Sequence, residues 1–219
     1  MDEASKTKLF YPELFSNYIK GDILDIGAGG DPVTPKATVF DKPQGNAERI
    51  SEYFQKESFD TVFSSHCLEH VNEPTVVIRD WFALVKPGGH LFVIVPDEDL
   101  YEQGIFPSTY NRDHKWTFTI HKWDSWSTNS VNVIELLLSL VALADIKLIS
   151  LEDCMYRYSL PRYDQTSTPI TESAIEFIVR KKTEKEIEKA KGHQMQKPVQ
   201  KLLDHFDAFD TNSDGRITR

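Results

Sequence analysis

The stretch from Gly21 to Gly30, GDILDIGAGG, decides the fold of this chain. Residues 23–26 form a short, mostly apolar run that is bounded by glycines, and this pattern predicts a buried strand. Asp25 lies near the carboxyl end of the run, and three of the four residues after Ile26 are glycines. Glycine lets the main chain adopt a positive φ angle and approach a ligand that a Cβ atom would hold off. Because open α/β folds bind their ligands at the carboxyl ends of parallel strands, the stretch predicts a cofactor-binding turn.

The spacing of the glycines limits which cofactor this turn can bind. A dinucleotide fingerprint requires a third glycine three residues after the second, and Pro32 occupies that position. Pro32 and Pro35 also leave little room for a helix whose N-terminus would bind a phosphate. A ligand with a cationic centre fits better, because three carboxylates lie near the turn, those of Asp25, Asp31 and Asp41. S-adenosylmethionine is such a ligand, and a nucleotide or a purely structural turn are the alternatives.

Length and composition indicate one globular domain with an appendage. The chain has 219 residues, of which 40% are hydrophobic and 27% charged, which is enough to bury a sizeable core. Its net charge of −9 argues against a nucleic-acid partner, which needs a basic surface. Cys67 and Cys154 lie far apart in apolar surroundings, which favours buried free thiols in a reducing compartment. No apolar run is long enough for membrane insertion and the N-terminus lacks a signal-peptide core, so we expect a soluble, cytoplasmic protein.

Strands and helices are expected to alternate along most of the chain. The predicted strands are residues 23–26, 38–40, 59–64, 90–95, 146–151 and 174–179. The predicted helices are residues 9–19, residues 78–85, which end at a turn over Lys86–Gly89, and the strongly apolar residues 129–144. This alternation predicts an α/β fold with a doubly wound, mostly parallel sheet and helices on both faces.

Polar residues after the second predicted strand are candidates for binding a nucleoside. Asp41 directly follows residues 38–40, where an acidic residue can accept hydrogen bonds from both ribose hydroxyls, as in the dinucleotide folds. A simple turn carboxylate is the alternative. Asn46 and Ala47 come next in a polar loop that suits an adenine edge. We therefore predict that this loop contacts the nucleoside part of the cofactor.

Four motifs in this order resemble the class I S-adenosylmethionine-dependent methyltransferases, in particular a type 11/23-like group with a strand–LEH–helix segment and a KPGG turn. The motifs are GDILDIGAGG at residues 21–30, ATVFD at 37–41, FDTVFSSHCLEHV at 59–71 and LVKPGGHLFVIVPD at 84–97. The resemblance implies a Rossmann-like domain over residues 1–180 with an antiparallel final strand. The short link between the first two strands departs from the usual family pattern and puts the family's first helix in doubt.

The resemblance also implies which residues hold the cofactor. Gly27, Ala28 and Gly29 would face the methionine part of S-adenosylmethionine, Asp41 its ribose, and residues 64–66 the methionine and adenine side. Together with the carboxylate and loop residues above, the predicted cofactor site consists of Asp25, Gly27, Ala28, Gly29, Asp41, Asn46, Ala47, Ser64, Ser65 and His66.

The segment from Glu98 to Trp126 is expected to contact the acceptor. It follows the strand at residues 90–95, at the edge of the sheet where an acceptor would sit beside the cofactor. Its DHKWTF stretch resembles a segment of bacterial methyltransferases thought to act on glycans or related metabolites. Aromatic rings can offer flat faces to a cyclic acceptor, with ordinary packing as the alternative. The predicted substrate residues are Tyr110, Arg112, Lys115 and Trp116.

The same stretch supplies the predicted catalytic residues. Methyl transfer to a hydroxyl requires a base that removes the proton as the bond forms. His114 is the candidate because the ordinary pKa of histidine lies nearest neutrality, and Asp113 could orient or replace it. A hydrogen-bonded structural histidine is the alternative. His66 and His70 are assigned to the cofactor wall and to helix packing, and no metal site is predicted at His66, Cys67 and His70 although the spacing would allow one.

The chain changes character after Arg180. Residues 181–198 are charged and helix-prone, which predicts a solvated linker and a helical C-terminal extension. Residues 199–219 resemble the first half of an EF-hand. The residues at its first, third and fifth loop positions are Asp210, Asn212 and Asp214. The bidentate acid at the twelfth position would fall beyond Arg219, so we expect this segment to bind calcium weakly if at all.

The main predicted function is S-adenosylmethionine-dependent O-methylation of a small-molecule or glycan-type acceptor. N-methylation stays open, because the cofactor motifs say nothing about the acceptor atom. The alternative is a non-catalytic protein that binds S-adenosylmethionine or acts as a calcium-linked regulator. A nicotinamide-dependent oxidoreductase is disfavoured by Pro32.

Overall fold

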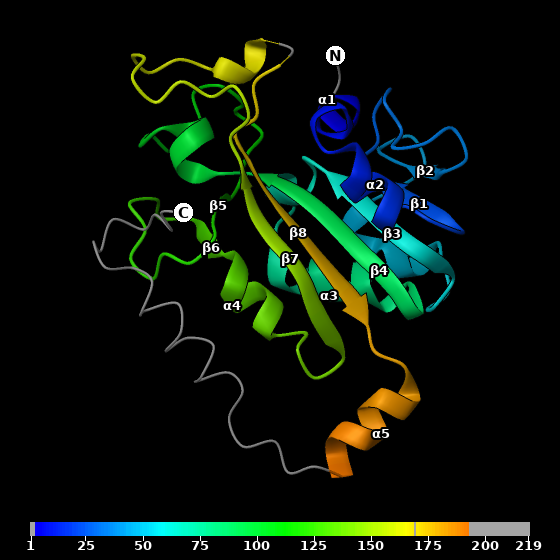
Figure 1. Ribbon diagram of the computed structural model, residues 1–219. Coiled ribbons are helices and arrows are strands. Elements are labelled where there is room, and N and C mark those ends of the chain that lie inside the picture. Colours follow the sequence, from blue (N-terminus) through cyan, green and yellow to red (C-terminus); the bar gives the residue numbers. More distant parts are fainter. Residues whose placement is uncertain (1–2, 169, 193–219) are drawn as a thin grey trace.

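The computed structural model describes residues 3–168 and 170–192, which contain a central sheet of six strands (Figure 1). The strands are β1 (Ile23–Ile26), β2 (Thr38–Phe40), β3 (Phe59–Ser65), β4 (Val85–Pro96), β7 (Ala144–Glu152) and β8 (Ala174–Lys181), in the spatial order β2-β1-β3-β4-β8-β7. Strands β1 to β4 pair in parallel, whereas β8 runs antiparallel to both of its neighbours, β4 and β7. The predicted mostly parallel sheet with an antiparallel final strand is confirmed.

Helices cover both faces of this sheet, as predicted for a doubly wound fold (Figure 1). One face carries α1 (Glu3–Phe10) and α2 (Pro12–Tyr18), and the other carries α3 (Pro74–Ala83) and α4 (Val133–Leu138). A small parallel sheet of β5 (Thr117–Thr119) and β6 (Ser130–Asn132) adjoins the carboxyl end of β4. After β8 the chain continues into α5 (Glu184–Gly192), which lies within the predicted charged linker.

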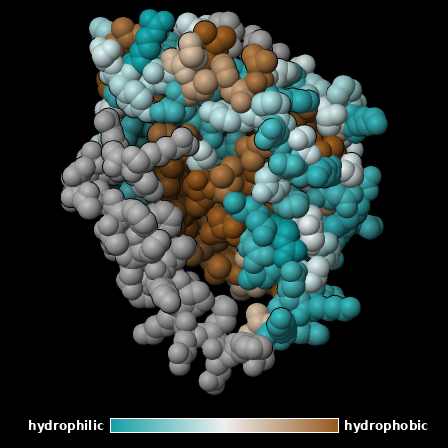
Figure 2. Space-filling view, in the orientation of Figure 1, coloured by the Kyte–Doolittle hydropathy of each residue, from teal (hydrophilic) through white to brown (hydrophobic). Residues whose placement is uncertain are grey.

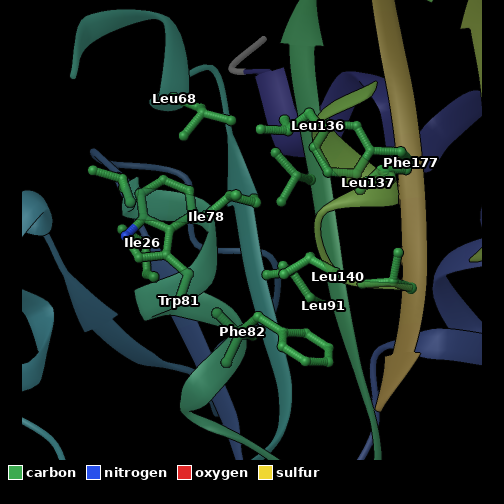
Figure 3. Packing of buried hydrophobic residues seen from close by; sticks show 14 of the residues in the cluster. Ile26, Leu68, Ile78, Trp81, Phe82, Leu91, Leu136, Leu137, Leu140 and Phe177 are labelled. Atoms are coloured by element: carbon green, nitrogen blue, oxygen red, sulfur yellow. The ribbon is translucent and has the colours of Figure 1, made fainter. Parts of the chain in front are cut away.

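Each inner strand buries alternate residues on the two faces, as expected of a sheet that is covered on both sides. Under α3 and α4 these residues are Leu24, Ile26, Val62, Leu91, Val93, Phe177 and Val179. Under α1 and α2 they are Ile23, Phe63, Phe92, Ile94 and Ile178. Trp81 of α3 is fully buried in the first set (Figure 3), and its Nε1–H donates a hydrogen bond to the carbonyl oxygen of Ala47 at 3.0 Å. This bond ties α3 to the loop that follows β2.

The single helix predicted for residues 9–19 is wrong. Two short helices meet there, because α1 ends at Phe10 and α2 begins at Pro12. Proline has no N–H to donate and disfavours helical angles in the residue before it, so a helix can begin at Pro12 but cannot run through it. Tyr11 accordingly has the non-helical angles φ −124° and ψ 52°.

The turn predicted at Lys86–Gly89 is part of a strand instead. Helix α3 ends at Ala83 and β4 already begins at Val85, with a shift of its register against β3. A Cβ atom at Gly89 would come within 2.5 Å of the carbonyl oxygen of Asp60. Glycine is therefore needed here for close approach in an irregular strand rather than for a chain reversal.

The long helix predicted for residues 129–144 is also wrong, because the segment divides into β6, α4 and a turn. The side-chain oxygen of Asn132 accepts a hydrogen bond from the N–H of Glu135 at 3.0 Å, so this residue ends β6 and caps α4. Helix α4 has only 6 residues, and the hydroxyl of Ser139 donates to the carbonyl oxygen of Leu136 where it ends. A continuous apolar run does not distinguish a buried strand from a buried helix, which explains the error.

Helix α1 is fastened to the sheet and to the glycine turn by polar contacts. Lys6 Nζ lies 3.5 Å from Glu172 Oε2, with both side chains only 1% exposed, and the hydroxyl of Thr7 donates to Glu172 Oε1 at 2.9 Å. The N–H and hydroxyl of Ser5 donate to the carboxylate of Asp31, at 2.8 and 2.5 Å. These contacts hold α1 beside the turn that follows β1.

The surface of the described residues is mixed in character. Figure 2 shows hydrophobic residues gathered near the middle of the view, with hydrophilic residues around them on the parts that are not grey. None of the helices among residues 3–168 and 170–192 has both the length and the apolar character needed to cross a membrane. The EF-hand-like segment with Asp210, Asn212 and Asp214 lies outside the described residues, so its predicted calcium chemistry stays a prediction.

Candidate functional site

Two adjoining cavities lie at the carboxyl ends of β1, β2 and β3, and Gly27 and His66 line both of them. The smaller one, of about 300 Å³, we call the turn cavity; its other lining residues include Ala4, Asp25, Ala28, Gly29, Asp31 and Ser65. The larger one, of about 800 Å³, we call the loop cavity; its other lining residues include Asp41, Asn46, Ala47, His70, Arg112 and Lys115. The predicted cofactor residues and part of the predicted acceptor segment therefore meet at one edge of the sheet.

The glycine turn depends on Gly27 and Gly29 in different ways. Both have left-handed backbone angles, with φ of +77° and +55°. A Cβ atom added to Gly27 would lie 2.6 Å from the Cβ atom of Cys67, whereas one added to Gly29 would meet nothing within 4 Å. Position 27 therefore requires glycine for both conformation and space, and position 29 for conformation alone.

Asp25 is buried beside the turn cavity, with 1% of its surface exposed. Its Oδ2 accepts a hydrogen bond from the N–H of Val33 at 2.6 Å. Burial raises the pKa of Asp25 to about 7, although the Val33 hydrogen bond acts in the opposite direction, and the carboxylates of Asp31 and Asp41 raise it further. A cation placed in the turn cavity would therefore favour the charged form of Asp25.

Asp41 stands directly after β2 on the wall of the loop cavity. Its two carboxylate oxygens accept hydrogen bonds from the N–H of Gly29 at 2.9 Å and the N–H of Lys42 at 2.6 Å. The side-chain oxygen of Asn46 accepts a hydrogen bond from the N–H of Glu48 at 2.9 Å. Asp41 is thus held against the glycine turn, and Asn46 caps the short helical segment Ala47–Glu52, where the ribose and adenine contacts were predicted.

Of the three residues predicted at the end of β3, two line the cavities and one does not. Ser65 and His66 lie on the wall, and Ser65 Oγ is 2.9 Å from His66 Nδ1. Ser64 is fully buried, and its hydroxyl donates to the carbonyl oxygen of Ile26 at 2.9 Å. Successive residues of a strand point to opposite faces, so Ser64 links β3 to β1 where the prediction expected a cofactor contact.

The far wall of the loop cavity consists of Arg112, Asp113 and Lys115. The backbone fixes this segment to the residues after β3, because the N–H groups of Lys115 and Trp116 both donate to the carbonyl oxygen of Glu69, at 2.9 and 3.2 Å. Two of the predicted substrate residues, Arg112 and Lys115, consequently lie at the cavity.

The other two predicted substrate residues occupy packing environments. Trp116 Nε1–H donates to the carbonyl oxygen of Asn72 at 3.1 Å, and its half-buried ring packs against the core. The ring of Tyr110 contacts that of Tyr101, with centroids 5.8 Å apart, and carries the guanidinium of Arg162 over its face at 4.4 Å. Neither residue is among those that line the loop cavity in the described part of the chain.

His114 is buried, with 3% of its side chain exposed, and lines neither cavity within the described residues. Its Nδ1 lies 2.7 Å from Glu102 Oε1, and its Nε2 lies 3.9 Å from Glu69 Oε1. The carboxylate that orients His114 is therefore that of Glu102, whereas Asp113 was expected in this role. No local pattern marks Glu102, because its contact with His114 arises only when the loop folds back.

His70 connects His114 with the loop cavity, although helix packing was predicted for it. It lines the cavity, and its ring lies edge-on to that of His114 with centroids 5.0 Å apart. Its Nδ1 lies 3.1 Å from the carbonyl oxygen of Asp113, and its Nε2 lies 3.7 Å from Glu69 Oε1. Burial lowers the pKa of His70. We call Glu69, His70 and His114 the Glu69 cluster.

The sheet order, the glycine turn after β1 and the acidic residue after β2 together define a Rossmann-like site for a nucleoside cofactor. A family model described as a methyltransferase domain matches residues 6–133, which is more than half of the 219-residue chain. The chain therefore belongs to this methyltransferase family.

Curated relatives match a shorter part of the chain. A ubiquinone biosynthesis O-methyltransferase of Aliivibrio fischeri is 35% identical over 78 residues, which are 32% of this chain and 33% of the relative. A protein of the same name from Xanthomonas euvesicatoria pv. vesicatoria is 54% identical over 39 residues, which are 18% of this chain and 16% of the relative. The chain thus spans no more than 33% of the length of these two relatives.

Solved structures share the fold over most of the chain. A SAM dependent methyltransferase from Archaeoglobus fulgidus superposes with a TM-score of 0.52 at 15% identity, covering 82% of this chain and 95% of that one. A putative methyltransferase from Bacillus halodurans C-125 superposes with a TM-score of 0.50 at 16% identity, covering 81% of this chain and 100% of that one. At these identities the similarity shows the fold alone, which is the Rossmann-like fold of S-adenosylmethionine-dependent methyltransferases.

Proposed function

We propose that this protein transfers a methyl group from S-adenosylmethionine to a hydroxyl oxygen of a small-molecule or glycan-type acceptor. The observation that carries the proposal is the junction of the two cavities at Gly27 and His66. It brings the predicted cofactor residues against a wall of Arg112, Asp113 and Lys115. The local matches to O-methyltransferases favour oxygen as the accepting atom.

The residues at the two cavities fit S-adenosylmethionine. Gly27 lines both cavities and has no side chain that would hold a ligand away from the backbone. The carboxylate of Asp25 suits the cationic methionine part, and that of Asp41 suits ribose hydroxyls. The further residues that we assign to the cofactor are Ala28, Gly29, Asn46, Ala47, Ser65 and His66.

When bound, S-adenosylmethionine supplies a methyl group on a sulfonium centre that an acceptor oxygen can attack. The protein has to hold the acceptor oxygen in line with that group and keep it there. Arg112 and Lys115 offer positive charge on the cavity wall, which suits a polar or anionic group of the acceptor. A cavity of about 800 Å³ is within the usual size of small-molecule sites.

The acceptor hydroxyl must lose its proton as its oxygen attacks. We assign this task to the Glu69 cluster as a unit, since His70 lines the loop cavity and His114 lies behind it. Glu102 holds His114 in place within this unit. Asp113 is the second candidate, because it lines the same cavity.

Calorimetric titration of the full chain with S-adenosylhomocysteine tests the cofactor site. We expect saturable binding that is lost in Gly27→Arg and weakened in Asp41→Ala, with Asp22→Ala as the control. Asp22 is exposed and pairs with Lys86 Nζ at 2.7 Å, at the opposite end of β1. If the folded chain does not bind the ligand at all, the methyltransferase proposal fails.

A screen of hydroxylated metabolites and glycans with S-adenosylmethionine then tests the acceptor. The expected result is a product with one added methyl group on oxygen, detected by mass spectrometry. Methylation of amines alone would overturn the choice of oxygen. Tight cofactor binding without any methylated product would favour the non-catalytic alternative.

A further inference from the structure

The Glu69 cluster places three metal-ligating atoms around one point beside the loop cavity. The ring nitrogens of His70 and His114 and a carboxylate oxygen of Glu69 all lie within 4.8 Å of one another. His70 Nε2 is 3.7 Å and His114 Nε2 is 3.9 Å from the same atom, Glu69 Oε1. We propose that this cluster binds one divalent transition-metal cation through two imidazole nitrogens and one carboxylate.

The outer nitrogens of both histidines are held in the way that metal-binding histidines require. A carbonyl oxygen can only accept, so His70 Nδ1 must donate to the carbonyl oxygen of Asp113, 3.1 Å away. His114 Nδ1 lies 2.7 Å from Glu102, whose carboxylate accepts in the same way. In a neutral histidine this leaves the lone pair on Nε2, the nitrogen that lies 3.7 Å (His70) or 3.9 Å (His114) from Glu69 Oε1. A carboxylate or carbonyl behind a ligating histidine is the usual outer-shell arrangement.

Charge in the cluster also favours a divalent cation. Glu69 and Glu102 are both buried, with 0% and 2% of their side chains exposed, and His114 lies between them. A divalent cation bound to the ring nitrogen of His114 would place positive charge between these two carboxylates. Buried charges are stable only when they are paired or coordinate a metal.

The ligand types and distances indicate the class of metal. Two imidazoles and one carboxylate suit zinc, iron, manganese or cobalt rather than magnesium or calcium, which prefer oxygen ligands. Bonds of about 2.1 Å in a tetrahedral site put ligand atoms about 3.4 Å apart. The distances of 3.7 and 3.9 Å from Glu69 Oε1 must therefore shorten by a few tenths of an ångström, and the two histidine nitrogens, which lie within 4.8 Å of each other, must approach as well. His70 can make this adjustment, because 33% of its side chain is exposed.

A cation here would have a place in the proposed reaction. Three protein ligands leave coordination positions open, as in catalytic metal sites, and His70 forms part of the cavity wall. A hydroxyl that coordinated the cation would lose its proton more readily, because a cation lowers the pKa of an oxygen ligand. With both histidines as ligands, Asp113 on the same cavity wall would accept that proton. This role rests on the proposed function, but the binding of the cation does not.

Titration of the chelator-treated full chain with zinc chloride, followed by calorimetry, tests the proposal. We expect one saturable site per chain and a visible absorption band when cobalt replaces zinc. His70→Ala should weaken binding by at least about 100-fold, and Glu102→Gln by about 10- to 100-fold through the outer shell. The matched control is His121→Ala, a half-buried histidine in the connection between β5 and β6.

Two outcomes would overturn the metal site: no saturable binding of zinc, cobalt or manganese, or binding that His70→Ala and Glu102→Gln leave unchanged. The second outcome would place the cation elsewhere in the chain. Titration of the same samples with S-adenosylhomocysteine keeps the proposals apart. Cofactor binding without zinc binding contradicts the metal site alone, and zinc binding without cofactor binding contradicts the proposed function alone.

Discussion

The glycine turn at residues 27–30 and the loop at residues 98–129 form neighbouring walls of one site but are built differently. In the turn, backbone conformation sets the geometry: Gly27 has a positive φ angle, and the N–H of Gly29 donates to Asp41. In the loop, side chains from separate parts of the chain meet, as when His114 contacts Glu102 and Glu69.

This difference decides what each wall can tolerate. A wall made of backbone is sensitive to a Cβ atom where the space is filled, as at Gly27, and to the anchoring of the segments beside it. A wall made of side-chain contacts can lose one partner and keep its fold, while it loses the chemistry of that partner. Substitutions at the glycine turn should therefore change mainly stability and cofactor affinity. Substitutions in the loop should change mainly the reaction with the acceptor.

The largest expected effect is on stability. Lys6→Met should lower the free energy of unfolding by about 3–5 kcal/mol, because it removes the ammonium from the buried Glu172 carboxylate beneath α1. His70→Ala, which removes a ring that packs against His114 of the loop wall, should cost about 1 kcal/mol or less. Urea unfolding followed by circular dichroism measures both, with the exposed Lys8→Met as a control. Equal losses of unfolding free energy in Lys6→Met and His70→Ala would contradict the proposed difference in stability between the two walls.

The next largest effect is on cofactor affinity. Gly27→Ala should weaken S-adenosylhomocysteine binding by about 100-fold, equivalent to about 2.7 kcal/mol, because the new Cβ atom would meet Cys67 at 2.6 Å. Gly29→Ala has the same kind of backbone strain but open space, so its affinity should fall by no more than about threefold. Calorimetry on the matched pair is decisive. Similar losses would mean that conformation alone shapes the turn.

A smaller effect concerns the pH dependence of binding on the turn wall. Burial raises the pKa of Asp25 to about 7, so its carboxylate gains charge as the pH rises through 7. Affinity for cationic S-adenosylmethionine should therefore increase about tenfold from pH 6 to pH 8 and level off above that. Asp25→Asn should remove the dependence. A wild-type affinity that is flat across this range would show that Asp25 does not face the cationic part of the ligand.

The smallest expected effect is on the KM for the acceptor, which should change without a change in cofactor affinity. Arg112→Ala removes an exposed guanidinium from the loop wall and should leave the affinity for S-adenosylhomocysteine within about twofold. The KM for an acceptor found in the screen should rise several-fold, because the acceptor loses a charged contact. Steady-state kinetics beside calorimetry gives both values. A change in cofactor affinity with an unchanged KM would assign Arg112 to the cofactor instead.

The strands and the glycine turn could be predicted because their signals are local. Residues 91–95 are apolar throughout, and all of them are buried in β4. Asp41 follows a short apolar run, and it stands at the end of β2. Pro12 is an equally local signal for the break between α1 and α2, although the apolar spacing of residues 9–19 predicts one continuous helix. In contrast, the division of residues 129–144 depends on the pairing of β6 with β5, which no local pattern reveals.

The candidate site divides in the same way. Gly27, Asp41 and His66 could be placed from the sequence because each lies within a few residues of a strand end. The DHKWTF stretch could also be recognised in the sequence, but the prediction that Asp113 orients His114 was wrong. That orientation comes from Glu102, and His114 reaches the cavity only through His70.

The sequence by itself determined where the six strands of the central sheet lie, where the glycine turn lies and hence which edge of the sheet carries the two cavities. Backbone conformation depends mainly on the few residues around it, so these features can be read in the chain. Only the tertiary structure decided that Glu69 and Glu102 lie on either side of His114 and that Lys115 pairs through its backbone with Glu69. Contacts between distant residues depend on how the loop packs against the end of β3, and local sequence does not encode that packing.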